Sequence, residues 1–269
     1  MKLIAIHSMP RSGSTWLGSI IDSSPVVSYK MQPLFSYRLK GFLSDKSTER
    51  KIKLFKSKLL EIEDDFMDQI EKKNRGIIPN FKKKDVKYIA YKETRYHYIL
   101  DNLLGKDENT FLVGLIRNPL AHLNSWMMAP KEFRKELGWR FEEEWRYANK
   151  KNENKREEYY GYEKWKEVAY LFHNLELKYP NQVYLINYLD FMLNTIKSTE
   201  KLFAYLNLPL DKQTLDFIES SKSKNVDDPY GVYRYKIKDD DWKRNLPKHI
   251  VDYVYNDLKE SILEQYLKS

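Results

Sequence analysis

The chain has 269 residues, a formal net charge of +8 and no cysteine, which excludes a disulfide framework and any thiolate metal site. This length favours one α/β domain, 1–269, with a large core and helical insertions. No apolar run approaches about 18 residues and no signal peptide is recognisable, so we expect a cytoplasmic enzyme without a membrane span. Lysine and glutamate are intermixed, which argues against nucleic acid as a partner, whereas the positive charge suits an anionic cofactor or acceptor.

The first predicted unit is a strand, a tight turn and a helix. Residues 2–8 are apolar enough for a buried parallel strand. An amphipathic helix follows, with its apolar side chains on one face: Trp16, Leu17, Ile20 and Ile21. The turn between strand and helix presents backbone N–H groups and the positive end of the helix dipole. Such a turn favours binding of a phosphate or sulfate.

This turn differs from the loop of nucleoside-triphosphate enzymes, which has the pattern G-x-x-x-x-G-K-[ST]. If Gly13 matches the second glycine, Ser14 replaces the lysine and Thr15 takes the last position. The basic residue is instead Arg11, whose guanidinium can hold an anion at two points. The loop therefore suits a nucleotide with a short 5′ anionic group, without the usual lysine and Mg²⁺ arrangement. An ordinary Ser/Gly turn is the alternative.

The run from Pro10 to Leu17 resembles the 5′-phosphosulfate loop of the sulfotransferases, which use 3′-phosphoadenosine 5′-phosphosulfate (PAPS) and release 3′-phosphoadenosine 5′-phosphate (PAP). The resemblance implies an α/β fold related to the P-loop proteins, with a central parallel sheet flanked by helices. It also implies binding of PAPS without a metal. The cofactor contacts that it implies in this loop are Arg11, Ser12, Gly13, Ser14, Thr15 and Trp16.

A second strand over 26–31 ends at Gln32-Pro33. In many bacterial sulfotransferases this position resembles Glu-Pro, with the glutamate near the reaction centre. The neutral amide of Gln32 cannot take up a proton at pH 7, although it can donate a hydrogen bond to sulfate or acceptor. The charged stretch 35–84 predicts one or two amphipathic helices, which form either a lid on the acceptor pocket or a solvated packing layer.

A third strand over 86–91 leads directly into Lys92 and Glu93. This resembles the Lys-Glu pattern of the glycan-modifying sulfotransferases and implies that Glu93 is the general base, assisted by Lys92 and Arg11. Transfer to a hydroxyl needs a base within about 3 Å of the acceptor proton and a cation near the leaving group. A surface Lys-Glu pair at a strand end is the alternative, and His97 is either a second candidate base or a local packing residue.

The clearest later strand, 110–116, precedes Arg117, with Asn118 as a natural N-cap and Pro119 as the first helical residue. Ser125 follows the cap by about two helical turns and therefore shares a helix face with it. An arginine followed eight residues later by a serine resembles the 3′-phosphate element of the sulfotransferases. The resemblance implies that Arg117 and Ser125 bind the 3′-phosphate.

The remaining segments are less specific. Residues 130–178 predict a charged helical insertion whose aromatic side chains form either an acceptor cleft or core. Tyr188 ends the last predicted strand, 183–188, and resembles the tyrosine that contacts adenine. In the loop 220–241, Arg234, with Lys236 as the alternative, resembles the basic residue that closes over the 3′-phosphate. Residues 247–267 predict one terminal amphipathic helix.

These features predict sulfuryl transfer from PAPS to a hydroxyl or amine of a small-molecule or glycan acceptor that the sequence does not identify. A P-loop kinase is one alternative, but Ser14 in the lysine position and the lack of an evident Mg²⁺-binding aspartate argue against it. A non-catalytic nucleotide-binding module is the other alternative. The joint presence of Arg11, Arg117 and Ser125 argues against that function.

Overall fold

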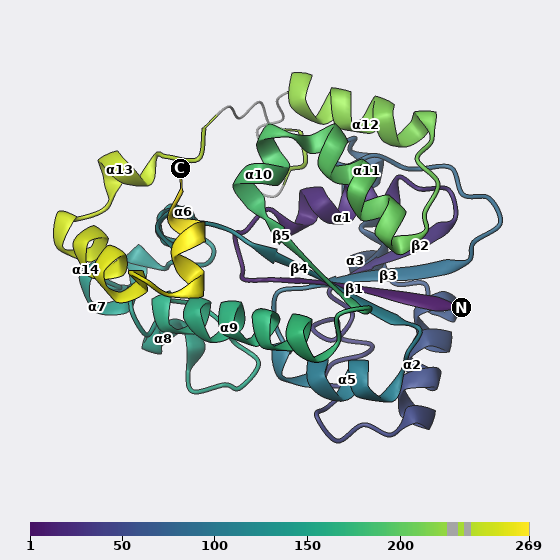
Figure 1. Ribbon diagram of the computed structural model, residues 1–269, viewed down its shortest axis with the longest axis horizontal. Coiled ribbons are helices and arrows are strands. Elements are labelled where there is room, and N and C mark those ends of the chain that lie inside the picture. Colours follow the sequence, from purple (N-terminus) through teal and green to yellow (C-terminus); the bar gives the residue numbers. More distant parts are fainter. Residues whose placement is uncertain (225–230, 234–237, 269) are drawn as a thin grey trace.

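The computed structural model describes residues 1–224, 231–233 and 238–268. Their strands form one parallel sheet in the order β2-β3-β1-β4-β5 (Figure 1). The strands are β1 (Lys2–Ser8), β2 (Val27–Met31), β3 (Tyr88–Glu93), β4 (Thr110–Ile116) and β5 (Val183–Asn187). The predicted fold class is therefore confirmed, and each predicted strand is present within two residues of its expected start.

The register of the sheet brings three strand ends to one level. His7 of β1 pairs with Glu93 of β3, and Ser8 pairs with Leu115 of β4. Because all strands are parallel, their carboxyl ends meet at one edge of the sheet, where ligands collect in this class of fold. The loop after β1 and the residues after β3 and β4 therefore lie close together.

Helices cover both faces of the sheet (Figure 1). One face packs against α1 (Ser14–Asp22), α10 (Tyr188–Leu193), α11 (Thr195–Leu206) and α12 (Lys212–Ser223). The opposite face packs against α2 (Glu49–Glu61), α5 (Leu100–Lys106) and α9 (Tyr162–Lys178). Strand β1 is buried on both sides, since Ile4 and Ile6 face the first group of helices while Leu3 and Ala5 face the second.

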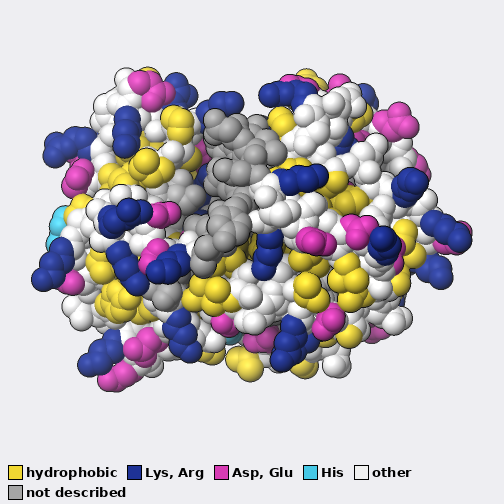
Figure 2. Space-filling view, turned by 90° about the horizontal axis from the view of Figure 1, so that it is seen from above, with side chains coloured by type: hydrophobic (Ala, Val, Ile, Leu, Met, Phe, Trp, Pro, Cys, Tyr) yellow, Lys and Arg dark blue, Asp and Glu magenta, His cyan; other side chains and the backbone are white. Residues whose placement is uncertain are grey.

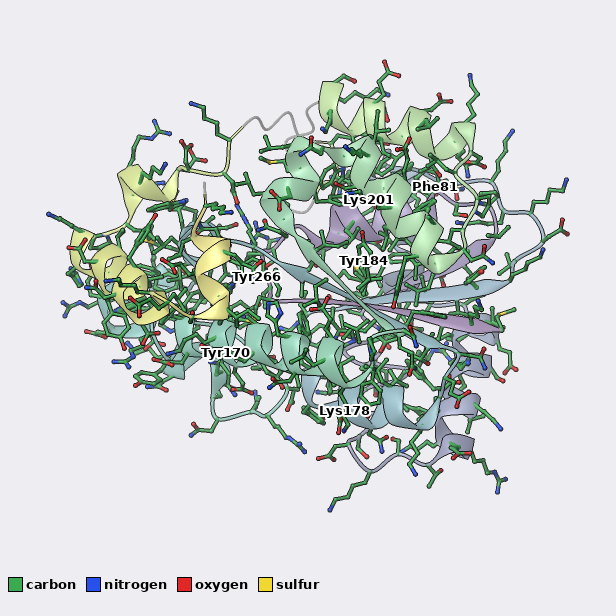
Figure 3. The ribbon with its side chains drawn as sticks, in the orientation of Figure 1. Phe81, Tyr170, Lys178, Tyr184, Lys201 and Tyr266 are labelled. Carbon is green, nitrogen blue, oxygen red and sulfur yellow. The ribbon has the colours of Figure 1, made fainter. Side chains whose placement is uncertain are left out.

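The C-terminal part packs beside α6 (Pro119–Met127) and α9. It contains α13 (Trp242–Asn245), α14 (Lys248–Leu258) and the 3₁₀ helix η3 (Ile262–Leu267), so the prediction of one continuous terminal helix was wrong. The break occurs at Glu260, whose φ of 62° is not helical, and Ser261 then accepts a hydrogen bond from the Leu263 N–H at 3.2 Å. Tyr266 of η3 lies over α9, where its hydroxyl is 3.1 Å from His173 Nε2 (Figure 3).

The two insertions combine helices, as expected, with irregular segments. Within 35–84, α2 is followed by only two short helices, α3 (Asp65–Asp68) and α4 (Ile70–Asn74), and the buried face of α2 is Ile52, Phe55 and Leu59. The second insertion, 130–178, begins with the 3₁₀ helix η2 (Lys135–Leu137) and the single turns α7 (Phe141–Glu144) and α8 (Asn149–Asn152), and it ends with the long helix α9; the 3₁₀ helix η1 (His97–Ile99) lies before it, between β3 and α5. Left-handed φ values at Gly138 and Gly161 interrupt the second insertion. Most of its aromatic residues, such as Phe141 and Tyr159, are core.

The surface shows no strong segregation of charge in the view of Figure 2. Lysine and arginine side chains are interspersed with aspartate and glutamate over the face drawn there. In the described part of the chain, no helix combines the length and the apolar character needed to cross a bilayer.

Candidate active site

A cavity of about 960 Å³ opens at the carboxyl ends of the strands. One group of lining residues comes from the loop after β1, from α6 and from α10, and includes Arg11, Ser125 and Tyr188. A second group comes from the ends of β2 and β3 and from both insertions, and includes Gln32 and Lys92. The 65–72 region of the first insertion lines the cavity, whereas α2 does not. In the chain as described, no group of three or more His, Asp or Glu side chains is arranged to hold a metal ion.

The loop between β1 and α1 is shaped by Gly13. This residue has a φ of 87° and caps α1, and the N–H groups of Trp16 and Leu17 donate to its carbonyl. A Cβ atom at Gly13 would lie 2.5 Å from a ring carbon of Tyr188. Both the backbone angle and the closeness of the ring therefore require glycine here. Tyr188 is the first residue of α10, so the loop and the end of β5 are in direct contact.

Helix α6 is hydrogen-bonded to the loop between β1 and α1. Asn118 caps this helix through hydrogen bonds from the N–H groups of Leu120 and Ala121, and Pro119 is its first residue, as predicted. Four residues after the cap, His122 Nδ1 lies 2.7 Å from the carbonyl oxygen of Pro10. Because a carbonyl only accepts hydrogen bonds, Nδ1 carries the proton. Burial lowers the pKa of His122 to about 3, so a neutral histidine fixes the loop to α6.

Arg11 connects the loop to two later parts of the chain. Its Nε donates to Ser125 Oγ at 3.4 Å, and its NH1 lies 3.8 Å from Glu132 Oε1. Arg11 has a φ of 64°, an uncommon backbone conformation for a residue other than glycine. The loop conformation thus aims the guanidinium at the N-terminal part of the second insertion. Arg11 was expected from the loop after the first strand, and Ser125 from the helix after Arg117. The structure brings these two residues into contact.

Arg117 follows β4 and its guanidinium makes three polar contacts. Its Nε donates to Asp239 Oδ2 at 2.7 Å, NH2 donates to Asp239 Oδ1, and NH1 donates to the Arg11 carbonyl at 2.6 Å. The side chains of Arg117 and Asp239 are only 9% and 4% exposed. The guanidinium carbon is 5.1 Å from the centre of the Tyr188 ring. Asp239 was not expected from the sequence, because no local pattern connects it with a residue 122 positions earlier.

Trp16 lines the cavity from the first turn of α1. Its Nε1 donates to Ser221 Oγ of α12 at 2.9 Å, and its ring meets the edge of Phe191 of α10. Trp16 therefore has a fixed orientation set by two other helices. Ser12, by contrast, is 1% exposed and is not among the residues that line the cavity.

Lys92 and Glu93 point in opposite directions. Lys92 lines the cavity, whereas Glu93 is fully buried, does not line it, and accepts a hydrogen bond from the Leu34 N–H at 2.7 Å. Burial lowers the pKa of Lys92 to about 8 and raises the pKa of Glu93 to about 8. At pH 7 Lys92 is therefore mostly charged and Glu93 mostly protonated. This placement supports a role for Lys92 in the site and does not support Glu93 as the general base.

The second candidate base, His97, does not line the cavity either. His97 is fully buried, with its Nδ1 3.0 Å from His7 Nδ1 and its ring against Tyr159. Gln32 does reach the cavity, where its Nε2 donates to Thr94 Oγ1 at 2.7 Å. The sequence left two interpretations of His97 open, a second candidate base and a local packing residue. Its buried position supports the packing residue.

Comparison with known proteins identifies the family. The model of the sulfotransferase family matches residues 4–212. This chain is a sulfotransferase. No match was found among curated proteins.

Several solved structures have a fold similar to that of this sulfotransferase. The mouse sulfotransferase SULT7A1 complexed with PAP has a TM-score of 0.56 at 15% identity, over 99% of this chain and 87% of that one. Retinol dehydratase in complex with androsterone and inactive cofactor PAP has a TM-score of 0.55 at 13% identity, over 97% of this chain and 82% of that one. A sulfotransferase from Alicyclobacillus acidocaldarius has a TM-score of 0.50 at 14% identity, over 98% of both chains.

The predicted site residues of this sulfotransferase fall into three groups. Those that line the cavity are Arg11, Gly13, Ser14, Thr15, Trp16, Lys92, Arg117, Ser125 and Tyr188. Those that do not are Ser12 and Glu93. Arg234 and its alternative Lys236 lie outside the described residues. Glu132, which the sequence analysis missed, also lines the cavity, and nothing in its local sequence separates it from other residues of the second insertion. Tyr160, one of the aromatic residues expected to form either an acceptor cleft or core, lines the cavity too.

Proposed function

We propose that this sulfotransferase transfers the sulfuryl group of PAPS to a hydroxyl or amine of a small-molecule or glycan acceptor, with residues 1–269 forming one catalytic domain. The observation that carries the proposal is the meeting of Arg11, Ser125 and Arg117 at the Gly13 loop within one cavity. Two of the structures of similar fold hold PAP. The cavity is also large enough for a nucleotide together with a small acceptor.

The loop and α1 would bind the phosphosulfate end of PAPS. The N-terminus of a helix favours an anion, and Arg11 adds a guanidinium beside it. Arg117 and Ser125 would bind the 3′-phosphate. Tyr188, whose ring lies against both Gly13 and Arg117, would contact adenine next to the fixed ring of Trp16.

Two cations would stabilise the charge that develops during transfer. In an in-line reaction the acceptor attacks sulfur while the bond from sulfur to the bridging phosphate oxygen breaks. Negative charge then grows on the departing phosphate, and preorganised cations lower the energy of that state. Arg11 lies in the loop that would hold this phosphate. Lys92 reaches the same cavity from β3 and is mostly charged at pH 7.

The test is a transfer assay with PAPS labelled with radioactive sulfur. The full chain is incubated in EDTA with a library of phenols, alcohols, amines and sugars. We expect label to appear on at least one acceptor, together with an equal amount of PAP. A parallel incubation with labelled ATP and Mg²⁺ serves as the control. Transfer of phosphate from ATP, with no transfer from PAPS, would contradict the proposal and favour the kinase alternative.

A further inference from the structure

The acidic residues of the cavity differ sharply in their exposure. Within the described residues, the carboxylates that line it are Asp65, Glu71, Glu132 and Asp241. Asp65 is exposed, and Glu71 and Asp241 have side chains that are 82% and 54% exposed. The side chain of Glu132 is only 15% exposed. Glu132 is therefore the one of these four that is held inside the cavity.

Glu132 lies next to the cations that the transfer would use. Its Oε1 is 3.8 Å from a terminal nitrogen of Arg11. It also acts on Lys92: burial lowers the pKa of that lysine, and the negative charge of Glu132 opposes this shift. A group placed between the phosphosulfate loop and β3 is near the position of the reacting sulfur in the proposed complex.

The surrounding structure fixes the position of Glu132. Tyr160, which also lines the cavity, donates its hydroxyl proton to Glu132 Oε2 at 2.7 Å. The Glu132 N–H donates to the Ala129 carbonyl at 2.8 Å, and Trp126 Nε1 donates to the Glu132 carbonyl at 3.3 Å. These bonds attach Glu132 to the end of α6, the helix that carries Ser125. The backbone of Glu132 is therefore held by the same helix that contacts Arg11, and Tyr160 orients its carboxylate.

We propose that Glu132, and not Glu93, is the general base of the sulfuryl transfer, with Tyr160 as its positioning residue. This inference rests on the proposed function. Glu132 takes the proton from the acceptor O–H or N–H, and the freed electron pair forms the bond to sulfur. The bond from sulfur to the bridging oxygen breaks, its electron pair stays on the 5′-phosphate of PAP, and the proton later leaves Glu132 for solvent.

The first test compares three glutamine variants of the full chain, with labelled PAPS as donor and 2-naphthol as the probe acceptor. For Glu132→Gln we expect a fall in kcat of about 100-fold or more, the usual effect of losing a general base, with PAP affinity unchanged within about twofold. Glu93→Gln keeps near-normal turnover. Glu136→Gln is the matched control, because Glu136 is exposed and lies outside the cavity.

A second comparison separates a base from a merely structural residue. An acceptor that ionises near neutral pH, such as 4-nitrophenol, needs a base less than 2-naphthol does. The loss in Glu132→Gln should therefore be several-fold smaller with 4-nitrophenol, and Tyr160→Phe should show a partial loss with the same dependence on the acceptor. Near-normal turnover of Glu132→Gln with 2-naphthol, or equal losses with both phenols, would overturn the assignment. If the wild-type chain itself releases no PAP from PAPS, the proposed function fails instead.

Discussion

Arg117 and Asp239 form a two-point ion pair at the carboxyl end of β4, with Arg117 Nε 2.7 Å from Asp239 Oδ2. A carboxylate and a phosphate bind the same edge of a guanidinium. Asp239 thus lies where the 3′-phosphate of PAPS would bind if Arg117 is its ligand. Binding would then require Asp239 to move or to share the guanidinium, and its negative charge would oppose the incoming phosphate.

Replacing Asp239 by asparagine should therefore strengthen binding of PAP. The amide keeps a hydrogen-bond acceptor for Arg117 but removes the competing charge. We expect the Kd of PAP in Asp239→Asn to fall by about fivefold, which corresponds to about 1 kcal/mol. Calorimetric titration measures this change, with AMP, which lacks the 3′-phosphate, as the control ligand that should change little. Weaker PAP binding in this variant would mean that Asp239 orients Arg117 for the phosphate and does not compete with it.

Removing the guanidinium should have the opposite effect. Arg117→Ala should weaken PAP binding by about 2–3 kcal/mol, the value of a charge-assisted hydrogen bond or more. Affinity for AMP should change little, because AMP makes no contact with this side chain in the proposed complex. Titrations with both nucleotides give the answer. An equal loss for PAP and AMP would show that Arg117 supports the loop through its bond to the Arg11 carbonyl and does not bind the 3′-phosphate.

The Gly13 loop should not tolerate a side chain. In Gly13→Ala the new Cβ would lie 2.5 Å from the Tyr188 ring, and φ stays at 87°. We expect a loss of about 1–2 kcal/mol in the free energy of unfolding from the backbone conformation alone, and weaker PAP binding in addition. Urea unfolding and calorimetry measure the two effects. Adding Tyr188→Ala relieves only the contact with the ring, so part of the loss should remain in the double variant. Full recovery there would contradict a role for the backbone angle.

The buried Glu93 should make stability depend on pH. Its pKa of about 8 in the folded chain exceeds the ordinary value of 4.5, so the folded state holds this proton more tightly than the unfolded state does. Wild-type stability then decreases as pH rises through this window, whereas glutamine does not titrate. The difference in the free energy of unfolding, Glu93→Gln minus wild type, should therefore increase between pH ~5.5 and pH ~7.5. The increase is up to about 1.4 kcal/mol per pH unit. Urea unfolding at both pH values tests this, and a constant difference would show that Glu93 is ionised in the fold.

The fold and the conformation of the Gly13 loop could be predicted from sequence because their determinants are local. Strand β1, the Gly13 turn, and the Asn118-Pro119 cap each depend on a few adjacent residues, and the structure has all three. The expected boundary of β3 differs from the observed one next to Glu93. The prediction ended this strand at Tyr91, but it extends to Glu93, and alternation along the strand then places Lys92 and Glu93 on opposite faces.

Two parts of the site depend on long-range folding and could not be predicted in this way. Asp239 reaches Arg117 from the C-terminal segment, and Glu132 reaches Arg11 from an irregular part of the second insertion. Neither contact follows a strand or helix period, which is the signal that sequence reasoning uses. The aromatic residues of that insertion gave no such signal either, since Tyr160 lines the cavity while its neighbour Tyr159 packs against His97.

The most direct test of the account is calorimetric titration of the full chain with PAP in EDTA, compared with ATP in the presence of Mg²⁺. The loop carries Arg11 and has Ser14 in place of the lysine of nucleoside-triphosphate sites. We therefore predict metal-independent binding of PAP with micromolar or tighter affinity, and weak binding of ATP. Tight binding of ATP that requires Mg²⁺, with no binding of PAP, would contradict the assignment of this cavity to PAPS.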